Sequence, residues 1–148
     1  MNATRRTVLI AGALSAITAL SFSSAVFAAS DLVELQSLNA ANKPITVAVP
    51  KNPQRIAVAD FSVLDTLDHW GLGERIVALP QTTALPYLPQ YFKKSKKVTN
   101  LGTLKEIDLE GLMAAEPDVI FISGRLAKKY DELSKIAPVV FMTADHEK

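Results

Sequence analysis

The stretch that decides the fold runs from Arg55 to Gly73 and reads RIAVADFSVLDTLDHWGLG. It opens with a short apolar run, residues 55–59, of the kind that forms buried parallel strands. A loop over residues 60–62 follows, in which Asp60 or Ser62 can cap the next helix. The apolar residues then recur at helical spacing, and two glycines end the helix. The stretch therefore predicts a strand, a loop and a helix in direct succession.

The same alternation continues on both sides of this unit. After a polar lead-in, the pattern predicts strands at 45–49, 55–59, 76–79, 98–100, 119–122 and 139–142. It predicts helices over 109–113, capped by Asp108, and over 126–136, with a short irregular helix in 85–92 and a solvated basic stretch at 93–97. Strands separated by helical connections indicate an α/β fold, a parallel sheet flanked by helices on both faces.

Three loops stand out, because ligands of such sheets bind beyond the carboxyl ends of the strands. These loops are residues 60–62, 80–83 and 123–125. In the last of them Arg125 follows a buried strand and Gly124, and Lys128 lies one helical turn further on. A guanidinium and an ammonium at the start of a helix favour an anion-binding corner. The alternative, a surface arginine in a loop, stays open at this point.

Composition narrows the class of protein. The chain has 148 residues, of which 49% are hydrophobic and 21% charged, a net charge of +1 and no cysteine. Disulfide scaffolds and cysteine-ligated metal sites are excluded, and so is a disordered chain. The near-neutral balance provides no basic field for nucleic-acid binding. The length suits one domain.

Residues 1–28 have the pattern of a cleavable signal peptide. Arg5 and Arg6 precede an apolar run, and Val26 and Ala28 occupy the small-residue positions before the cleavage site. Serines and threonines dilute the run, which argues against a membrane anchor. The pair of arginines leaves both general secretion and twin-arginine export open. We expect the mature chain, residues 29–148, to be periplasmic.

Signatures of enzymes are weak. The sequence contains no G-x-S-x-G, P-loop or dinucleotide motif, and its histidines are His69 and His146. Asp65, Asp68 and His69 share one face of a predicted helix, where a metal site is conceivable, but a solvated face opposite the apolar residues explains them better and no fourth ligand is evident. We therefore predict neither an enzyme nor a metal site.

Several motifs in this order resemble the N-terminal lobe of periplasmic iron–siderophore-binding proteins of ABC transporters. They are VPKNPQRIAV at 49–58, LDTLD at 64–68, LG at 72–73, NLGTLK at 100–105, PDVIFISGR at 117–125 and YDEL at 130–133. The last motif, followed by IAP at 136–138, is similar to the branch that binds ferric catecholate or mixed catecholate–carboxylate siderophores. The resemblance covers about residues 44–142.

The resemblance implies a function. Such proteins are monomers with two α/β lobes joined by a helical linker, and they deliver a ferric siderophore to an inner-membrane permease. Iron(III) is carried within the siderophore complex, and no cofactor is intrinsic. The family's basic positions fall on Arg125 and Lys128, which suits a negatively charged ferric tris-catecholate. Lys105 and Phe61 are weaker ligand-binding candidates, with a surface lysine and a core aromatic as alternatives. Glu110 occupies the family's permease-docking position, although it also suits a helix N-terminus.

Length is the main departure from the family, whose members run to about twice this length. We expect residues 29–148 to form the N-terminal lobe without the second, and therefore to bury less of a ligand and bind it more weakly. The alternative functions are a truncated lobe that does not transport, a permease-interaction module and a small exported enzyme. Heme and cobalamin binders share the lobe architecture and also stay open.

Overall fold

The computed structural model describes residues 31–92 and 97–143. The predicted signal peptide, His146 and most of the predicted basic stretch lie outside these residues. Within the described part of the chain, no helix is long and apolar enough to span a membrane.

Five of the six predicted strands form a parallel central sheet, whereas the strand predicted at 45–49 lies outside it in an antiparallel pair. The five parallel strands are β3 (Ile56–Val58), β4 (Ile76–Leu79), β5 (Thr99–Asn100), β6 (Val119–Ile122) and β7 (Val139–Phe141). Their order across the sheet is β5-β4-β3-β6-β7. From β3 the chain adds strands on one side and then returns to add β6 and β7 on the other. The order therefore reverses between β3 and β6, where a crevice opens at the carboxyl ends of the strands.

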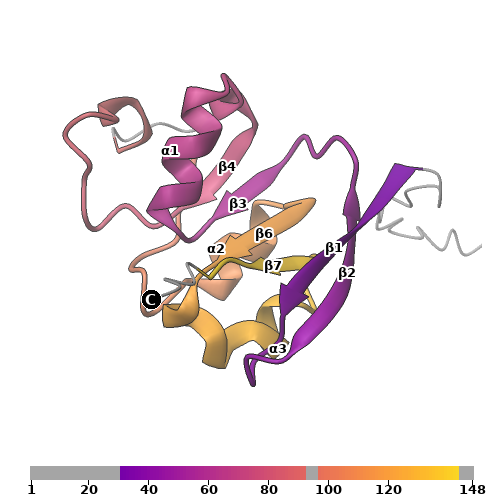
Figure 1. Cartoon of the computed structure of the whole chain (residues 1–148). Coiled ribbons are helices and arrows are strands. Elements are labelled where there is room, and N and C mark those ends of the chain that lie inside the picture. Colours follow the sequence, from indigo (N-terminus) through magenta and orange to yellow (C-terminus); the bar gives the residue numbers. More distant parts are fainter. Residues whose placement is uncertain (1–30, 93–96, 144–148) are drawn as a thin grey trace, which may run out of the picture.

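Helices cover both faces of the sheet (Figure 1). On one face lies α1 (Phe61–His69), which buries Val63, Leu64 and Leu67. On the other lie α2 (Leu109–Ala114), the 3-10 helix η4 (Gly124–Lys129) and α3 (Tyr130–Leu133). Because both faces are buried, β3, β4, β6 and β7 are continuously apolar rather than alternating, whereas the short edge strand β5 is polar.

The two predicted caps are confirmed. Asp60 accepts hydrogen bonds from the backbone N–H groups of Ser62 and Val63 at the start of α1. Asp108 accepts them from Glu110 and Gly111 at the start of α2. Each cap satisfies N–H groups that have no partner inside the helix.

The helix predicted over 126–136 is wrong in kind. The chain forms η4 and then a single α-helical turn, α3. Ser123 precedes η4, but its side chain makes no capping hydrogen bond. The backbone N–H of Leu126 bonds instead to the carbonyl of Ser123, three residues back, so the connection starts as a tighter 3-10 turn.

The polar lead-in predicted before residue 45 is also wrong, because residues 32–38 form a strand. This strand, β1 (Leu32–Leu38), pairs antiparallel with β2 (Pro44–Pro50). One face of the hairpin carries Val33, Leu35, Ser37, Ile45, Val47 and Val49, all on the same side by the register. The hairpin lies along β7 at the edge of the sheet (Figure 1).

The side chain of Ser37 fixes this arrangement. Its hydroxyl oxygen accepts a hydrogen bond of 2.9 Å from the backbone N–H of Phe141 in β7, and Ser37 is only 6% exposed. The neighbouring Met142 N–H bonds to Ile122 in β6. Successive N–H groups of a strand point to opposite edges, so the Phe141 N–H points to the edge that the hairpin covers.

Two of the glycines that follow α1 are needed for the turns there. Gly71, with φ of 70°, ends the helix in the left-handed region that glycine adopts without strain. Gly73 begins the 3-10 turn η2 (Gly73–Arg75), and a side chain at Gly73 would collide with the Tyr91 hydroxyl. Tyr91 ends a second 3-10 turn, η3 (Pro89–Tyr91), within the segment predicted as a short irregular helix.

Asp118 joins the amino ends of β3 and β6. Its Oδ2 accepts hydrogen bonds from the backbone N–H groups of Gln54 at 2.8 Å and Arg55 at 3.0 Å. The Arg55 guanidinium in turn donates to the carbonyl oxygens of Ala115 and Glu116, beyond the end of α2. Two segments far apart in the sequence are thereby tied together next to the paired strands.

Candidate functional site

A cavity of about 760 Å³ opens at the carboxyl ends of β3, β6 and β7, where the strand order reverses. Its lining comes from the loop between β3 and α1, the start of η4 and the residues after β7. The lining residues are Asp60, Ser62, Ser123, Gly124, Arg125, Met142 and Thr143. Two of the three loops selected from the sequence therefore meet at one site.

Asp60 forms the acidic part of this wall. Burial alone would raise the pKa of its carboxyl, but the hydroxyl and N–H of Ser62 and the N–H of Val63 all donate to it. Together with a contribution from the Ser123 hydroxyl, these donors lower the pKa of Asp60 below its ordinary value. Asp60 is therefore a carboxylate at neutral pH, and its charge is directed at the N-terminus of α1.

Ser123 and Gly124 form the opposite wall. The Ser123 hydroxyl oxygen is buried and, although it lies near enough to Asp60 to affect its pKa, it makes no hydrogen bond to any residue that the structure describes. Gly124 has an ordinary backbone conformation, and a Cβ added there would meet nothing within 4 Å. The glycine therefore leaves this wall of the cavity open.

Arg125 supplies the positive charge. Its exposed guanidinium has no hydrogen-bond or ion-pair partner among the residues that the structure describes. Lys128 is exposed three residues further along η4 and does not line the cavity. Side chains three residues apart eclipse each other in a 3-10 helix, so Lys128 lies on the same side of η4 as Arg125 and adds its charge there.

The other ligand-binding candidates lie outside the cavity lining. Phe61 is half-buried and packs edge-on against Phe92, with ring centroids 5.8 Å apart. Lys105 is exposed in the loop after β5. Strand β5 lies two positions from β3 in the sheet, or roughly 10 Å away. The loop at 80–83 follows β4 and does not line the cavity either. Glu110 is exposed near the start of α2.

Met142 and Thr143 line the cavity but were not selected from the sequence. They follow β7 directly, and the rule that singled out the other loops applies to them equally. Met142 is 45% exposed, which is unusual for a large apolar residue at the end of a buried strand. Asp60 and Ser62 were selected as part of the loop at 60–62 and as possible caps, and both line the cavity.

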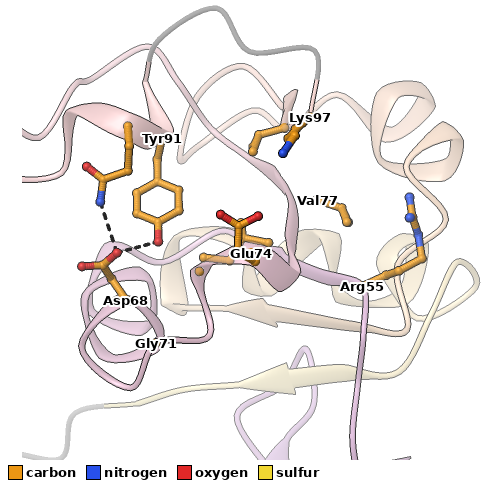
Figure 2. Close-up of a pocket in the computed structure, with 11 residues that line it drawn as sticks. Arg55, Asp68, Gly71, Glu74, Val77, Tyr91 and Lys97 are labelled. Atoms are coloured by element: carbon orange, nitrogen blue, oxygen red, sulfur yellow. Dashed lines mark hydrogen bonds between the residues drawn. The ribbon is translucent and has the colours of Figure 1, made fainter.

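A second cavity, of about 630 Å³, lies at the opposite edge of the sheet (Figure 2). Here Asp68 accepts hydrogen bonds from the Tyr91 hydroxyl at 2.6 Å and from Gln90 at 3.2 Å. Burial and the Asp68 carboxylate together raise the pKa of Tyr91. Asp68 is therefore engaged in holding η3 against α1. No group of three or more histidine, cysteine or acidic residues in the described part of the chain could hold a metal ion.

The fold and the site define a class: an α/β domain with a guanidinium and hydroxyl groups at a cavity at the switch point of a parallel sheet. A family model described as "Periplasmic binding protein" matches residues 56–148. The chain belongs to this family.

Individual relatives narrow the comparison. The chain is 41% identical over 100 residues to the petrobactin-binding protein YclQ of Bacillus subtilis, which covers 68% of this chain and 31% of that protein. The crystal structure of YclQ superposes with a TM-score of 0.67 at 36% identity, over 76% of this chain and 39% of that one.

Two further structures are similar. The siderophore-binding protein BauB, bound to a complex between two molecules of acinetobactin and ferric iron, matches with a TM-score of 0.62 at 28% identity, over 74% of this chain and 36% of that one. The periplasmic catecholate-siderophore-binding protein VctP of Vibrio cholerae matches with a TM-score of 0.58 at 31% identity, over 76% and 38%. The chain spans about a third of the length of the curated relatives it matches.

Proposed function

We propose that this chain is the N-terminal lobe of a substrate-binding component for ferric siderophore uptake by an ABC transporter. In this role it binds an anionic, catecholate-like ferric siderophore, carries iron(III) only within that complex and performs no catalysis. The named relatives that bind siderophores support this proposal. It places the protein in the periplasm as a monomer, exported by the signal peptide in residues 1–28.

One observation carries the proposal: the guanidinium of Arg125, which has no partner among residues 31–92 and 97–143, lies at a cavity in the crevice of the sheet. Structural arginines of this chain are used differently. Arg55 donates to two backbone carbonyls, and Arg75 donates to Asn52 and Pro53. A planar guanidinium with free donors can bind two anionic oxygens of a ferric chelate without competing for the iron.

Three further residues have proposed functions. Lys128 adds positive charge beside Arg125 and attracts the anion over a longer range. Lys105 and Phe61 stand away from the cavity lining and would contact only a large ligand that extends beyond it. Glu110, exposed on α2, is the proposed contact with arginines of the permease.

The test is calorimetric titration of the purified residues 29–148 with the iron(III) complex of a hexadentate tris-catecholate chelator. We expect measurable binding that weakens about 10- to 100-fold in Arg125→Ala, because hydrogen bonds to charged groups are lost. Lys129→Ala is the matched control, since it removes one positive charge from the same 3-10 helix, but a charge already paired with Glu132 at 3.1 Å.

The uncharged iron(III) complex of a trihydroxamate chelator should bind more weakly than the catecholate complex, and added salt should reduce the difference. Equal affinity of the wild type and Arg125→Ala for the anionic complex would refute the proposed role of Arg125. Absence of binding by the wild type at millimolar concentrations would favour the non-transporting lobe or the permease-interaction module.

A further inference from the structure

Among the described residues, the Ser123 hydroxyl oxygen is the only buried side-chain polar atom without a hydrogen-bond partner. Buried polar groups are nearly always paired, and an unpaired one costs free energy that the fold must recover elsewhere. Ser123 occupies the position before η4 where a serine side chain often caps a helix, yet it caps nothing. Apart from its contribution to the lowered pKa of Asp60, the hydroxyl is therefore not used by the described part of the fold.

The surroundings of Ser123 are those of a ligand contact. Ser123 lines the cavity at the carboxyl edge, two residues before Arg125, and the Gly124 between them leaves the wall open. A second hydroxyl at this corner is already committed, because Ser62 donates its hydrogen to Asp60. Asp60 also accepts from two backbone N–H groups of α1. The Ser123 hydroxyl lies close enough to help lower the pKa of Asp60 but makes no hydrogen bond to a described residue, so it can turn toward the cavity when a ligand is bound.

We propose that Ser123 is a specificity-determining residue of the binding site, whose hydroxyl donates a hydrogen bond to an anionic oxygen of the bound ferric chelate beside the oxygens held by Arg125. This inference rests on the proposed function and deepens it. Arg125 provides charge on a long, exposed side chain that can adjust to many anions. Ser123 provides a short donor from the rigid end of β6, which requires an acceptor at one position and thereby selects the geometry of the ligand.

The two ways in which Ser123 could matter predict opposite effects on stability. If the hydroxyl serves only the ligand, Ser123→Ala removes an unpaired buried polar group, and the thermal midpoint of the free protein stays the same or rises. If the hydroxyl serves the fold, the same substitution lowers the midpoint. Binding measured together with thermal unfolding therefore separates a ligand contact from a structural residue.

The experiment titrates residues 29–148, Ser123→Ala, Arg125→Ala and Ser134→Ala with the iron(III) complex of the hexadentate tris-catecholate chelator. Ser134 is the matched control, an exposed serine that lies outside the cavity lining and donates to the Asp131 carbonyl. We expect Ser123→Ala to bind about tenfold more weakly with an unchanged or higher thermal midpoint, while Ser134→Ala binds like the wild type.

Unchanged affinity in Ser123→Ala, with a clear loss in Arg125→Ala, would overturn the inference and leave the proposed function standing. A drop of several degrees in the thermal midpoint of Ser123→Ala would also overturn it, since the hydroxyl would then belong to the fold. If neither the wild type nor Ser134→Ala binds the complex, the proposed function itself fails and the inference fails with it.

Discussion

The substitution Ser37→Ala tests how the hairpin is attached to the sheet. Ser37 is the residue that joins β1 to β7, through the 2.9 Å hydrogen bond from the Phe141 N–H. That N–H points away from β6, toward the hairpin. Alanine keeps the strand and its apolar contacts but removes the acceptor. The Phe141 N–H is then left buried and unpaired.

The expected loss follows from this geometry. A buried donor that loses its partner costs about 1–3 kcal/mol, and Ser37 is buried enough for the upper half of this range to apply. We therefore expect the free energy of unfolding to fall by about 2 kcal/mol. At roughly 4 °C per kcal/mol, suitable for a domain near 100 residues, the thermal midpoint should fall by about 8 °C.

Urea unfolding followed by circular dichroism measures this loss, and amide hydrogen exchange at Phe141 locates it. The matched control is Ser134→Ala, which should change stability by less than about 0.5 kcal/mol because Ser134 is exposed. A loss in Ser37→Ala below about 0.5 kcal/mol, with exchange at Phe141 unchanged, would refute the reasoning. It would mean that β1 is held by its apolar face alone.

Three further predictions concern the site and its supports. Burial raises the pKa of the Asp60 carboxyl, but the hydrogen bonds that it accepts lower this pKa below the ordinary 3.8. The Asp60 charge therefore stabilises the fold fully above about pH 4 and less as the pH falls through the lowered pKa. The urea midpoints of the wild type and Asp60→Asn should converge below about pH 4, and a constant difference between them from pH 2 to 6 would contradict this prediction. Gly124→Ala should raise the free energy of unfolding by about 0.4–1 kcal/mol, because alanine fits the backbone and its methyl group meets no atom. The same methyl group enters the cavity, so the variant should bind the ferric tris-catecholate complex more weakly in calorimetry. Unchanged affinity would show that the ligand does not approach this wall. Asp118→Ala should lower the free energy of unfolding in urea by about 2 kcal/mol, because the backbone N–H groups of Gln54 and Arg55 lose a charged acceptor. A loss no larger than that of the exposed control Asp131→Ala would contradict this prediction.

Most strands were predictable because their signals are local. The apolar runs at 55–59, 76–79, 119–122 and 139–142 each contain an observed strand of the central sheet. The caps Asp60 and Asp108 act on N–H groups two and three residues ahead, so residue type and spacing were sufficient to identify them.

Local signals were present but weaker where the predictions failed. Val33 and Leu35 alternate with Glu34 and Gln36, and a turn containing Asn42 follows, with φ of 56°. This pattern indicates a hairpin, but the strand is stable only because its apolar face packs on the sheet and Ser37 meets Phe141. The spacing of Leu126, Tyr130 and Leu133 is compatible with an α-helix, but the segment starts as the 3-10 helix η4, and Ser123 makes no capping hydrogen bond there.

The sequence by itself determined the α/β class, the positions of the main strands and the place of Arg125 after a buried strand. Only the tertiary structure decided which loops share a cavity. β3 pairs with β6, so the loops at 60–62 and 123–125 meet, while the loop at 80–83 follows β4 on the far side of β3. Strand order depends on hydrogen bonds and packing between segments far apart in the chain, which local periodicity does not encode. For the same reason, only the folded chain shows that the Ser123 hydroxyl, two residues before Arg125, is buried with no hydrogen-bond partner in the described part of the chain.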